Sequence, residues 1–477
     1  MNLTETNSPK VAIVGGGLAG LAAASALVTR GCAVTVLESR PRLGGRASSF
    51  LDRNTSEWID NCQHVSLGCC TNFQDFCRRT GLERFLRTER ELSFIGRDGV
   101  VNRLRESSLP APLHLARSFQ GMSYLSAADR RSIARGIRRL CRWRPGKQRQ
   151  VSFLEWLNEQ RQTPGAIERF WTVILTSALS ETLERIDIGH ARKVIVDGFL
   201  RNRTGWRMQV PTLPLDEFYG KHLRARLEEQ GVEIRLQAGI ERVEIQDEQV
   251  RSVVLRNGQE VVADQFVLAF GPKLIVETVP ENSSVTRDLV SAMKMESAPI
   301  TSVHLWFDRE VCPLPHAVLI ERLSQWIFSR DKLQNRTPNV ETGHSYQVVI
   351  SASRNLKGRD QQEVIAEVVE ELSEIWPATR VAKLIHSRMV TEHQAVFSVQ
   401  PGIEGLRPGQ QSSISNLQYA GDWTNTGWPG TMEGAVRSGY LAAENVLTQL
   451  GRPERLVQRD LPTAWLSRLL LGIRSAK

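Results

Sequence analysis

The 477-residue sequence lacks several features that mark secreted or membrane-spanning proteins. Its seven cysteines are odd in number and irregularly spaced, and the adjacent Cys69 and Cys70 have no C-x-x-C partner, so neither a disulfide framework nor a metal site is predicted. No run of about 18 apolar residues predicts a transmembrane helix. The polar first nine residues show no apolar segment typical of a signal peptide. We therefore expect a protein of the reducing cytoplasm.

Net positive charge is concentrated in one segment. The net charge is +9, and residues 114–150 contain ten Lys or Arg and one acid, Asp129, so the rest of the chain is close to neutral. A chain that is basic throughout suggests nucleic acid, whereas one basic segment predicts a local anionic partner. We expect no nucleic-acid partner. The length allows about three domains with an ordinary globular core.

The strongest positive signal begins at Lys10. Residues 10–14 form a short apolar run typical of a buried parallel strand. An alanine-rich helix follows up to Leu27, and a second strand over residues 33–37 ends at Glu38. The intervening G-x-G-x-x-G spacing lets the backbone approach a pyrophosphate, and the acid is placed to bind ribose hydroxyls. The expected dinucleotide contacts are Gly15, Gly17, Leu18, Ala19, Gly20 and Glu38.

A basic segment with two glycines follows this acid and indicates which dinucleotide binds. Residues 40–46 read Arg-Pro-Arg-Leu-Gly-Gly-Arg, which resembles the R-x-G-G-R segment of the flavin-containing amine oxidase and phytoene desaturase superfamily. The resemblance implies FAD rather than NAD, with the last arginine near the FAD phosphates. The contacts that it implies are Ser39, Arg40, Gly44, Gly45 and Arg46.

A second signature of the same superfamily lies near the C-terminus, over residues 419–439. The resemblance implies that Asp422 bonds the ribityl or pyrophosphate region, and that the helix starting near Thr431 points its positive N-terminal end at the flavin. It also implies that the backbone of Val243 contacts the adenine region. The further contacts expected here are Gly421, Met432 and Glu433.

Two signatures almost 400 residues apart can share one cofactor only if the chain enters and leaves one domain repeatedly. We therefore predict the α/β class, with a discontinuous Rossmann-like FAD-binding domain and an α+β substrate domain over the flavin. The predicted FAD-binding parts are residues 1–105, 206–290 and 391–450. The predicted substrate domain comprises residues 106–205 and 291–390, and residues 451–477 form an amphipathic tail.

Residues 60–64 are the candidate for chemistry. Their sequence, Asp-Asn-Cys-Gln-His, resembles the D-N-x-Q-H segment of the squalene-associated FAD-dependent desaturases, the hydroxysqualene dehydroxylases, in which it approaches the flavin ring. Cys62 departs from the glycine of many relatives. The alternative is a polar turn before the helix predicted over residues 71–80. As a general acid we favour His64 over Asp60, because the ordinary histidine pKa lies nearer neutrality; alternatively, His64 only hydrogen-bonds the backbone.

Two amphipathic segments raise the question of a membrane. Ser126 is placed to cap a helix over residues 127–143 with isoleucine and leucine on one face and arginine over much of the rest. Residues 465–473 place Leu466, Leu469, Leu470 and Ile473 on one stripe about 14 Å long, too short to span a bilayer. Each segment fits either a protein surface or a membrane interface. We predict peripheral attachment to the inner face of the cytoplasmic membrane.

The resemblance implies a function and leaves alternatives. It implies an FAD-dependent enzyme that removes the hydroxyl of hydroxysqualene to give squalene, for hopanoid or sterol precursor synthesis, with a long-chain isoprenoid substrate and possible squalene-pathway partners. The apolar residues 151–200 are either core or the wall of its cavity. A carotenoid or phytoene-type desaturase or isomerase is the alternative. An amine oxidase is disfavoured, because residues 300–304 lack the flavin-facing lysine and Thr431 replaces an aromatic residue. A flavoprotein without enzyme activity is the remaining class. The sequence contains one dinucleotide fingerprint and no second one for a nicotinamide cofactor, so it does not identify the external reductant of the flavin.

Overall fold

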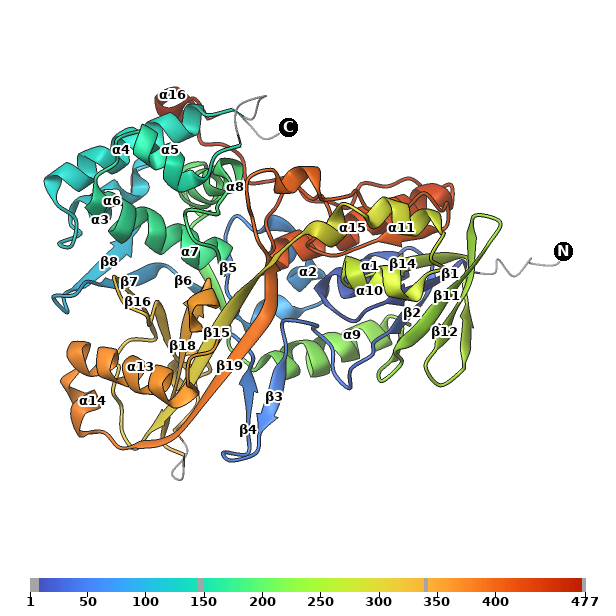
Figure 1. The fold of residues 1–477 in the computed structure, drawn as a ribbon, viewed down its shortest axis with the longest axis horizontal. Helices are drawn as coiled ribbons and strands as arrows, with labels where there is room; N and C mark the ends of the chain where they lie inside the picture. Colours follow the sequence, from blue (N-terminus) through green and yellow to red (C-terminus); the bar gives the residue numbers. More distant parts are fainter. Residues whose placement is uncertain (1–7, 145–149, 339–341, 474–477) are drawn as a thin grey trace.

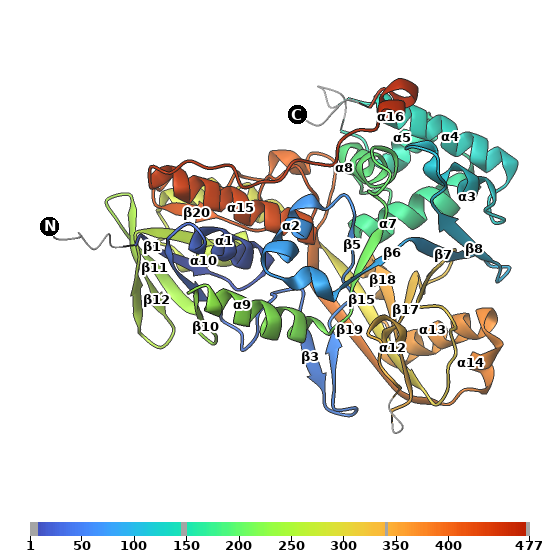
Figure 2. The same cartoon turned by 180° about the vertical axis from the view of Figure 1, so that it is seen from behind.

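The computed structural model describes residues 8–144, 150–338 and 342–473. Two large sheets with their covering helices form the main layers of the molecule, and the chain passes between them several times (Figures 1 and 2). The expectation about a signal peptide falls mainly on residues 1–7, and the last four residues of the predicted tail also lie outside the described residues.

A five-stranded parallel sheet carries the N-terminal fingerprint. Its order is β10-β2-β1-β14-β20, from the strands β1 (Lys10–Val14), β2 (Ala33–Leu37), β10 (Glu233–Arg235), β14 (Gln265–Leu268) and β20 (Leu417–Tyr419). One face packs on the helices α1 (Leu18–Val28) and α15 (Met432–Gln449). The other face packs on the antiparallel strands β11 (Ile240–Gln246), β12 (Gln249–Leu255) and β13 (Glu260–Val262). This arrangement confirms the predicted Rossmann-like architecture.

The second sheet has seven strands in the order β19-β15-β18-β17-β16-β7-β8. The strands are β7 (Glu91–Ile95), β8 (Val101–Arg105), β15 (Ser297–Phe307), β16 (His316–Leu319), β17 (Trp326–Ser329), β18 (His344–Ser351) and β19 (Leu384–Phe397). Val303 and Leu305 point to one face, where they pack with α13 (Gln361–Ile375). That helix begins after Asp360, whose side chain accepts hydrogen bonds from the amides of Gln362 and Glu363 as the N-cap.

A helical layer covers the opposite face of this sheet (Figure 1). Its interior side is apolar: Phe153, Trp171 and Leu175 are buried with Phe94 and Phe328 of the sheet. Two segments of this layer have π-helical geometry, which is frequent at functional sites. The layer consists of α4 (Ala127–Arg142), α5 (Phe153–Glu159), α6 (Pro164–Ala166), η3 (Ile167–Thr172, π), α7 (Val173–Leu179), α8 (Ile188–Lys193) and η4 (Val194–Leu200, π).

Shorter elements connect these layers. β3 (Ser49–Asp52) and β4 (Glu57–Asp60) form a hairpin, and β5 (Ser66–Leu67), β9 (Met208–Pro211) and β6 (Leu86–Glu89) form a small sheet. The remaining helices are α2 (Thr71–Arg79), α3 (Ala116–Gln120), α9 (Arg224–Glu229), α10 (Pro272–Thr278), α11 (Ser284–Leu289), α12 (Arg330–Leu333), α14 (Pro377–Val381) and α16 (Trp465–Leu471), with the π-helix η5 (Asp216–Leu223) and the 3-10 turns η1 (Leu82–Phe85), η2 (Leu113–Leu115), η6 (Ala292–Lys294), η7 (Ser353–Leu356) and η8 (Ile403–Gly405).

Two predicted domain boundaries need correction. Strands β7 and β8 belong to the seven-stranded sheet, although the sequence prediction assigned residues 1–105 to the FAD-binding domain. Strand β19 continues in that same sheet to Phe397, beyond the boundary predicted at residue 391. The reason is burial, because Leu92 and Phe94 pack under the helical layer. Residues 91–105 and 391–397 therefore lie on the substrate side.

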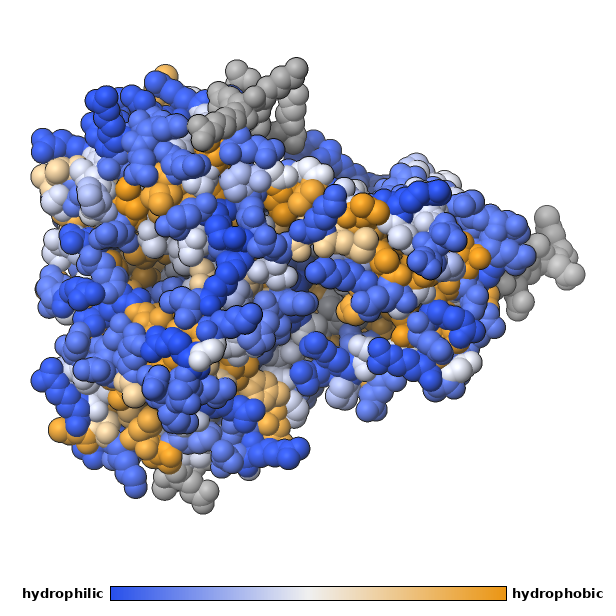
Figure 3. Space-filling model, in the orientation of Figure 1, coloured by the Kyte–Doolittle hydropathy of each residue, from blue (hydrophilic) through white to orange (hydrophobic). Residues whose placement is uncertain are grey.

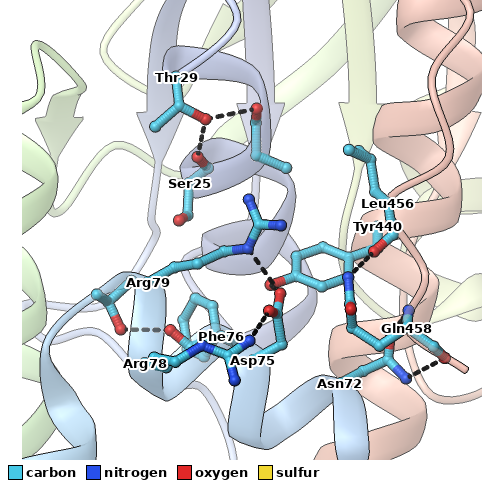
Figure 4. Close-up of polar contacts among 12 residues, drawn as sticks. Ser25, Thr29, Asn72, Asp75, Phe76, Arg78, Arg79, Tyr440, Leu456 and Gln458 are labelled. Atoms are coloured by element: carbon cyan, nitrogen blue, oxygen red, sulfur yellow. Dashed lines mark hydrogen bonds and ion pairs between the residues drawn. The ribbon is translucent and has the colours of Figure 1, made fainter. Parts of the chain in front are cut away.

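The C-terminal segment ties the two halves together. Asn72 of α2 accepts a hydrogen bond from the Gln458 amide (2.8 Å), and Asp75 accepts from the Tyr440 hydroxyl (3.0 Å) and from Arg79 (2.7 Å; Figure 4). Farther along, the Ala464 amide donates to the Arg201 carbonyl of the helical layer (2.9 Å). The chain from α15 to α16 therefore runs as a strap from the parallel sheet's helices to the helical layer.

The crossing of α1 and α15 gives a prediction. A Cβ on Gly439 would lie 2.2 Å from the Ala19 carbonyl oxygen, so we expect Gly439→Ala to push the helices apart and to cost about 1–3 kcal/mol of unfolding free energy. Chemical denaturation measures this loss. Gly405→Ala is the control, because nothing lies within 4 Å of its added Cβ. Equal stability of both variants contradicts the close helix crossing.

Candidate functional site

The glycines of the N-terminal fingerprint leave room at one place only. A Cβ added to Gly15 would lie 2.6 Å from the Ala269 carbonyl oxygen, and one added to Gly20 would lie 2.0 Å from the Gly15 carbonyl oxygen. These two glycines therefore allow close backbone packing. At Gly17, by contrast, the nearest atom to an added Cβ is Gly45 Cα at 3.9 Å. Gly17 is also the N-cap of α1 and supplies no capping side chain. The helix N-terminus at Leu18 and Ala19 therefore borders free space, which suits a diphosphate.

Glu38 lies at the end of β2, as predicted, and its carboxylate is fixed by the neighbouring backbone. One oxygen accepts from the Gly16 amide (2.7 Å), and the other accepts from the Arg40 amide (2.8 Å) and the Ser39 hydroxyl (3.2 Å). Glu38 is buried, whereas Ser39 and Arg40 are exposed. The acid is thus held beside Gly16, between the fingerprint and the end of β2; the space bordered by Gly17, Arg46 and the start of α15 is called the groove below.

An ion pair joins the two sequence signatures. Arg46 contacts the buried carboxylate of Asp422, 376 positions away, and also donates to the Ala395 carbonyl (2.9 Å). The Asp422 charge raises the pKa of Arg46. Gly44 forms a backbone bridge with Gly17, which places the arginine segment against the fingerprint. The segments predicted from the two signatures therefore meet in one groove.

The start of α15 completes this groove. Thr431 caps the helix, its hydroxyl accepting from the Gly434 amide (3.1 Å), and the Gly421 amide is held by the Ser438 hydroxyl (2.8 Å). Met432 is half-buried beside the cap. The helix N-terminus is thus positioned to stabilise negative charge.

Two of the predicted cofactor contacts have buried side chains. The Glu433 carboxylate is fully buried and accepts from the amides of Asn72 and Phe73 at the start of α2 and from Arg437. The Val243 side chain is buried in the core with Val14 and Leu37. Both side chains are thus engaged within the protein, and the backbone contact predicted for Val243 stays a prediction, as does any contact of the Glu433 backbone.

Residues 60–64 lead from the β3–β4 hairpin toward the centre of the molecule. Asp60 Oδ1 accepts from the Ser49 hydroxyl (2.6 Å) and the Leu215 amide (2.9 Å), and burial raises the pKa of its carboxyl. The Nδ1 atom of His64 lies 2.9 Å from the Cys62 carbonyl oxygen, and burial lowers the pKa of the imidazole. The backbone contact expected as the alternative role of His64 is thus present, and its Nε2 atom remains for other partners.

Sequence reasoning missed a polar centre on the seven-stranded sheet. Gln347 of β18 donates to the Ser302 hydroxyl of β15 (2.9 Å) and approaches the Asp60 carbonyl (3.5 Å). His304 lies two residues along β15 and is fully buried, and this burial lowers its pKa to about 3. The signal was present as polar residues at alternate positions of an otherwise apolar strand. This polar centre packs directly behind residues 60–64.

Two cavities border these elements. One of about 390 Å³ lies between the helical layer and the sheet, with Val173, Thr176 and Ser177 facing Val318 and Leu319. Trp326 donates to the Ser177 hydroxyl (2.9 Å), which fixes one contact across these layers. The larger cleft, about 950 Å³, lies beside the β3–β4 hairpin. Within the described chain, none of the predicted site residues lines either cavity.

Comparison with known proteins places this groove in a family. The chain matches the family model described as flavin containing amine oxidoreductase over residues 18–447. It is 25% identical over 463 residues to the chloroplastic/chromoplastic 15-cis-phytoene desaturase of Solanum lycopersicum, covering 93% of this chain and 78% of that protein. It is 24% identical over 478 residues to a probable zeta-carotene desaturase of Synechococcus elongatus, covering 92% and 98%.

Solved structures share the fold. An oxidoreductase from Methanosarcina mazei superposes with a TM-score of 0.68 at 17% identity, covering 90% of this chain and 98% of that chain. Cyclohexylamine oxidase from Brevibacterium oxydans superposes with a TM-score of 0.66 at 18% identity, covering 93% and 100%. The family match and the free space at Gly17 agree on FAD as the cofactor.

The groove yields a direct prediction. Gly17→Leu should fill the space at the start of α1 without a clash inside the protein, since only Gly45 lies within 4 Å of the added Cβ. We expect a folded protein that purifies without flavin absorbance, with an unfolding midpoint close to that of the wild-type apoprotein. Gly409→Leu, in open space, is the matched control and should stay yellow. Stoichiometric FAD in the Gly17 variant would refute the site.

Proposed function

This chain belongs to the flavin-containing amine oxidoreductase family, and from that premise we propose that it removes the hydroxyl group of hydroxysqualene to release squalene. The observation that carries the proposal is the position of residues 60–64. This segment resembles that of the hydroxysqualene dehydroxylases, and its first residue, Asp60, contacts both Ser49 of the hairpin and Gln347 of the polar centre. The protein is an FAD-dependent oxidoreductase; the substrate and the direction of the reaction are proposals.

The proposed reaction sets three requirements. One proton and one hydride convert the substrate C–OH into C–H and water, so the oxygen must be protonated as the C–O bond breaks. FAD in its reduced form supplies the hydride when bound, and an external donor must reduce it again. The protein must supply an acid, keep water from the allylic carbon and favour negative charge at the cofactor. The N-terminus of α15 meets the last requirement.

Of the two candidate acids, His64 is better placed for proton transfer. Asp60 Oδ1 is occupied by Ser49 and the Leu215 amide, so this carboxyl holds the hairpin to the start of η5. The contact of His64 Nδ1 with a carbonyl oxygen requires hydrogen on Nδ1. Nε2 therefore carries a proton only in the imidazolium form. Because burial lowers this pKa, the imidazolium form requires a lower pH than an ordinary histidine does.

Water exclusion is the task of the helical layer. Phe170, Ile174 and Phe199 are half-buried against the apolar core that this layer forms with the sheet. The cavity beside this core has a mixed lining, in which Val173, Val318 and Leu319 are joined by the charged Arg97, Glu168, Glu321 and Arg322. An allyl cation held against the apolar core, away from these carboxylates, would meet few nucleophiles other than the intended one.

Substitutions at residues 60 and 64 separate chemistry from structure. We expect His64→Ala to retain FAD and to lower turnover of hydroxysqualene by about 10²–10⁴, as for a missing general acid. Asp60→Asn keeps an acceptor for Ser49 and Leu215, and a comparable loss of turnover would identify the carboxyl as the acid. Ser49→Ala is the control, because it removes the hairpin contact and leaves both candidate acids. Normal turnover in both acid variants would place the acid elsewhere.

The pH profile gives a second prediction. His64 donates only when protonated, and its pKa lies below the ordinary value of about 6.5 because the ring is buried. We expect kcat/KM to rise as the pH falls through that lowered pKa and to level off below it. His64→Ala should lack this limb. A rate that increases toward alkaline pH in the wild-type protein contradicts an acid role for His64.

Carotenoid desaturation is the second candidate function. It is favoured by the similarity to proteins named as phytoene and zeta-carotene desaturases. Amine oxidation is not favoured, because β15 contains no lysine. Desaturation removes hydride from the substrate, so oxidised flavin would lose its yellow colour when phytoene is added anaerobically. We expect no such bleaching. Rapid bleaching by phytoene, with formation of a longer polyene, would favour this second function.

A further inference from the structure

We propose that α4 and α16 together form a docking surface for a bilayer containing anionic phospholipid. This α4–α16 surface consists of the exposed arginines of α4 and the exposed apolar residues of α16. The two helices pack against each other at one end of the molecule, where α16 lies on the helical layer to which α4 belongs (Figure 1). The proposal concerns binding and does not depend on the reaction proposed above.

Helix α4 presents nearly pure positive charge. Its inward face is anchored by Ile133, Gly136 and Leu140, all buried. The acid in its first turn, Asp129, is used in the capping box with Ser126 and by the Thr163 hydroxyl (2.5 Å). The exposed face carries Arg131, Arg135, Arg138, Arg139 and Arg142.

Three of these arginines have unused guanidinium groups. Arg139 donates to Gln160 (2.7 Å) and Arg131 donates to the Ala127 carbonyl (3.2 Å). Within the described part of the chain, Arg135, Arg138 and Arg142 make neither a hydrogen bond nor an ion pair. Their charge is therefore available to an external anion.

Helix α16 adds an apolar edge and corrects the predicted stripe. It ends at Leu471, where Gly472 adopts φ +67°, so Ile473 leaves the helix and is buried with Cys141 and Val196. The Ser467 hydroxyl donates to the Leu200 carbonyl (2.6 Å) and holds the other face on the protein. Trp465, Leu469 and Leu470 remain 66%, 71% and 45% exposed. Figure 3 shows an apolar spot among hydrophilic atoms where Figure 1 places α16.

This combination fits a lipid surface better than nucleic acid. Nucleic acid would use the arginines, but it offers no apolar interior for two exposed leucines. A bilayer interface accepts the leucines below the headgroups, the tryptophan at their level and the guanidiniums among phosphates. Seven helical residues extend only about 10 Å. Among the described residues no helix has the length and hydropathy to cross a bilayer, so the contact is peripheral.

Charge removal is the first test. Vesicles of phosphatidylcholine alone and of equimolar phosphatidylcholine and phosphatidylglycerol are sedimented with the purified FAD-loaded protein. We expect binding to the anionic vesicles, weakened by salt. Arg135→Gln/Arg138→Gln/Arg142→Gln should lower the partition coefficient by roughly a hundredfold, since each basic residue near an anionic surface contributes about fivefold. The matched control, Arg256→Gln/Arg287→Gln/Arg455→Gln, removes three exposed arginines of the FAD-binding half and should bind normally.

Removal of the apolar edge is the second test. Leu469→Gln/Leu470→Gln should lower vesicle binding and abolish the blue shift of Trp465 fluorescence on anionic vesicles. Val262→Gln/Leu274→Gln, which changes two exposed apolar residues elsewhere, is the control. Equal binding to both vesicle types, or normal binding by the arginine triple variant, overturns the proposal. So does tight binding of a duplex oligonucleotide, sensitive to the same arginines, in a protein that ignores vesicles.

Discussion

The ion pair between Arg46 and Asp422 is the contact on which the architecture of the site depends. It joins residues 376 positions apart, and each belongs to a turn that has no fixed position on its own. The arginine follows a pair of glycines that bridge to the fingerprint, and the aspartate precedes the cap of α15. Because the pair closes the groove from two sides, the parallel sheet, α1 and α15 must all be assembled before the cofactor site exists.

The position of α15 also fixes α2 and the segments that follow it. Glu433 is the second residue of α15, and its carboxylate accepts hydrogen bonds from the backbone amides of Asn72 and Phe73 at the start of α2. Helix α2 is held by Tyr440 and Gln458, and the strap beyond it reaches the helical layer. The segment that starts at Asp60 lies between these fixed parts and the sheet. The groove and the cavity are therefore positioned by one continuous set of buried contacts.

Much of the fold could be predicted because its signals are local. The first two strands, the helix between them and α13 follow from apolar patterns and caps within a few residues. The polar centre at Ser302 and Gln347 could not, because its two residues come from different strands and meet only in the sheet. The assignment of β7 and β8 failed for a similar reason, since their partner β16 lies more than two hundred residues later. The stripe on α16 failed because Gly472 ends the helix before Ile473.

In the candidate site, too, local features could be predicted from the sequence, whereas contacts between distant segments could not. Glycine spacing predicts cofactor contacts at Gly15, Gly17 and Gly20 alike, and only the folded backbone shows that Gly17 alone of the three has space for an added Cβ. The roles of Asp60 and His64 could not be ranked from residue type alone. In the structure, the Ser49 and Leu215 contacts occupy the carboxyl of Asp60, while His64 keeps Nε2 available. Burial then shifts the two pKa values in opposite directions.

The direction of hydride transfer is the central claim, and isotope incorporation tests it most directly. Protein whose FAD has been reduced anaerobically in D₂O is mixed with hydroxysqualene, and the product of a single turnover is examined by mass spectrometry and NMR. The account predicts squalene with one deuterium at the carbon that carried the hydroxyl group, together with reoxidised flavin. Unchanged hydroxysqualene, or squalene without deuterium at that carbon, would contradict it.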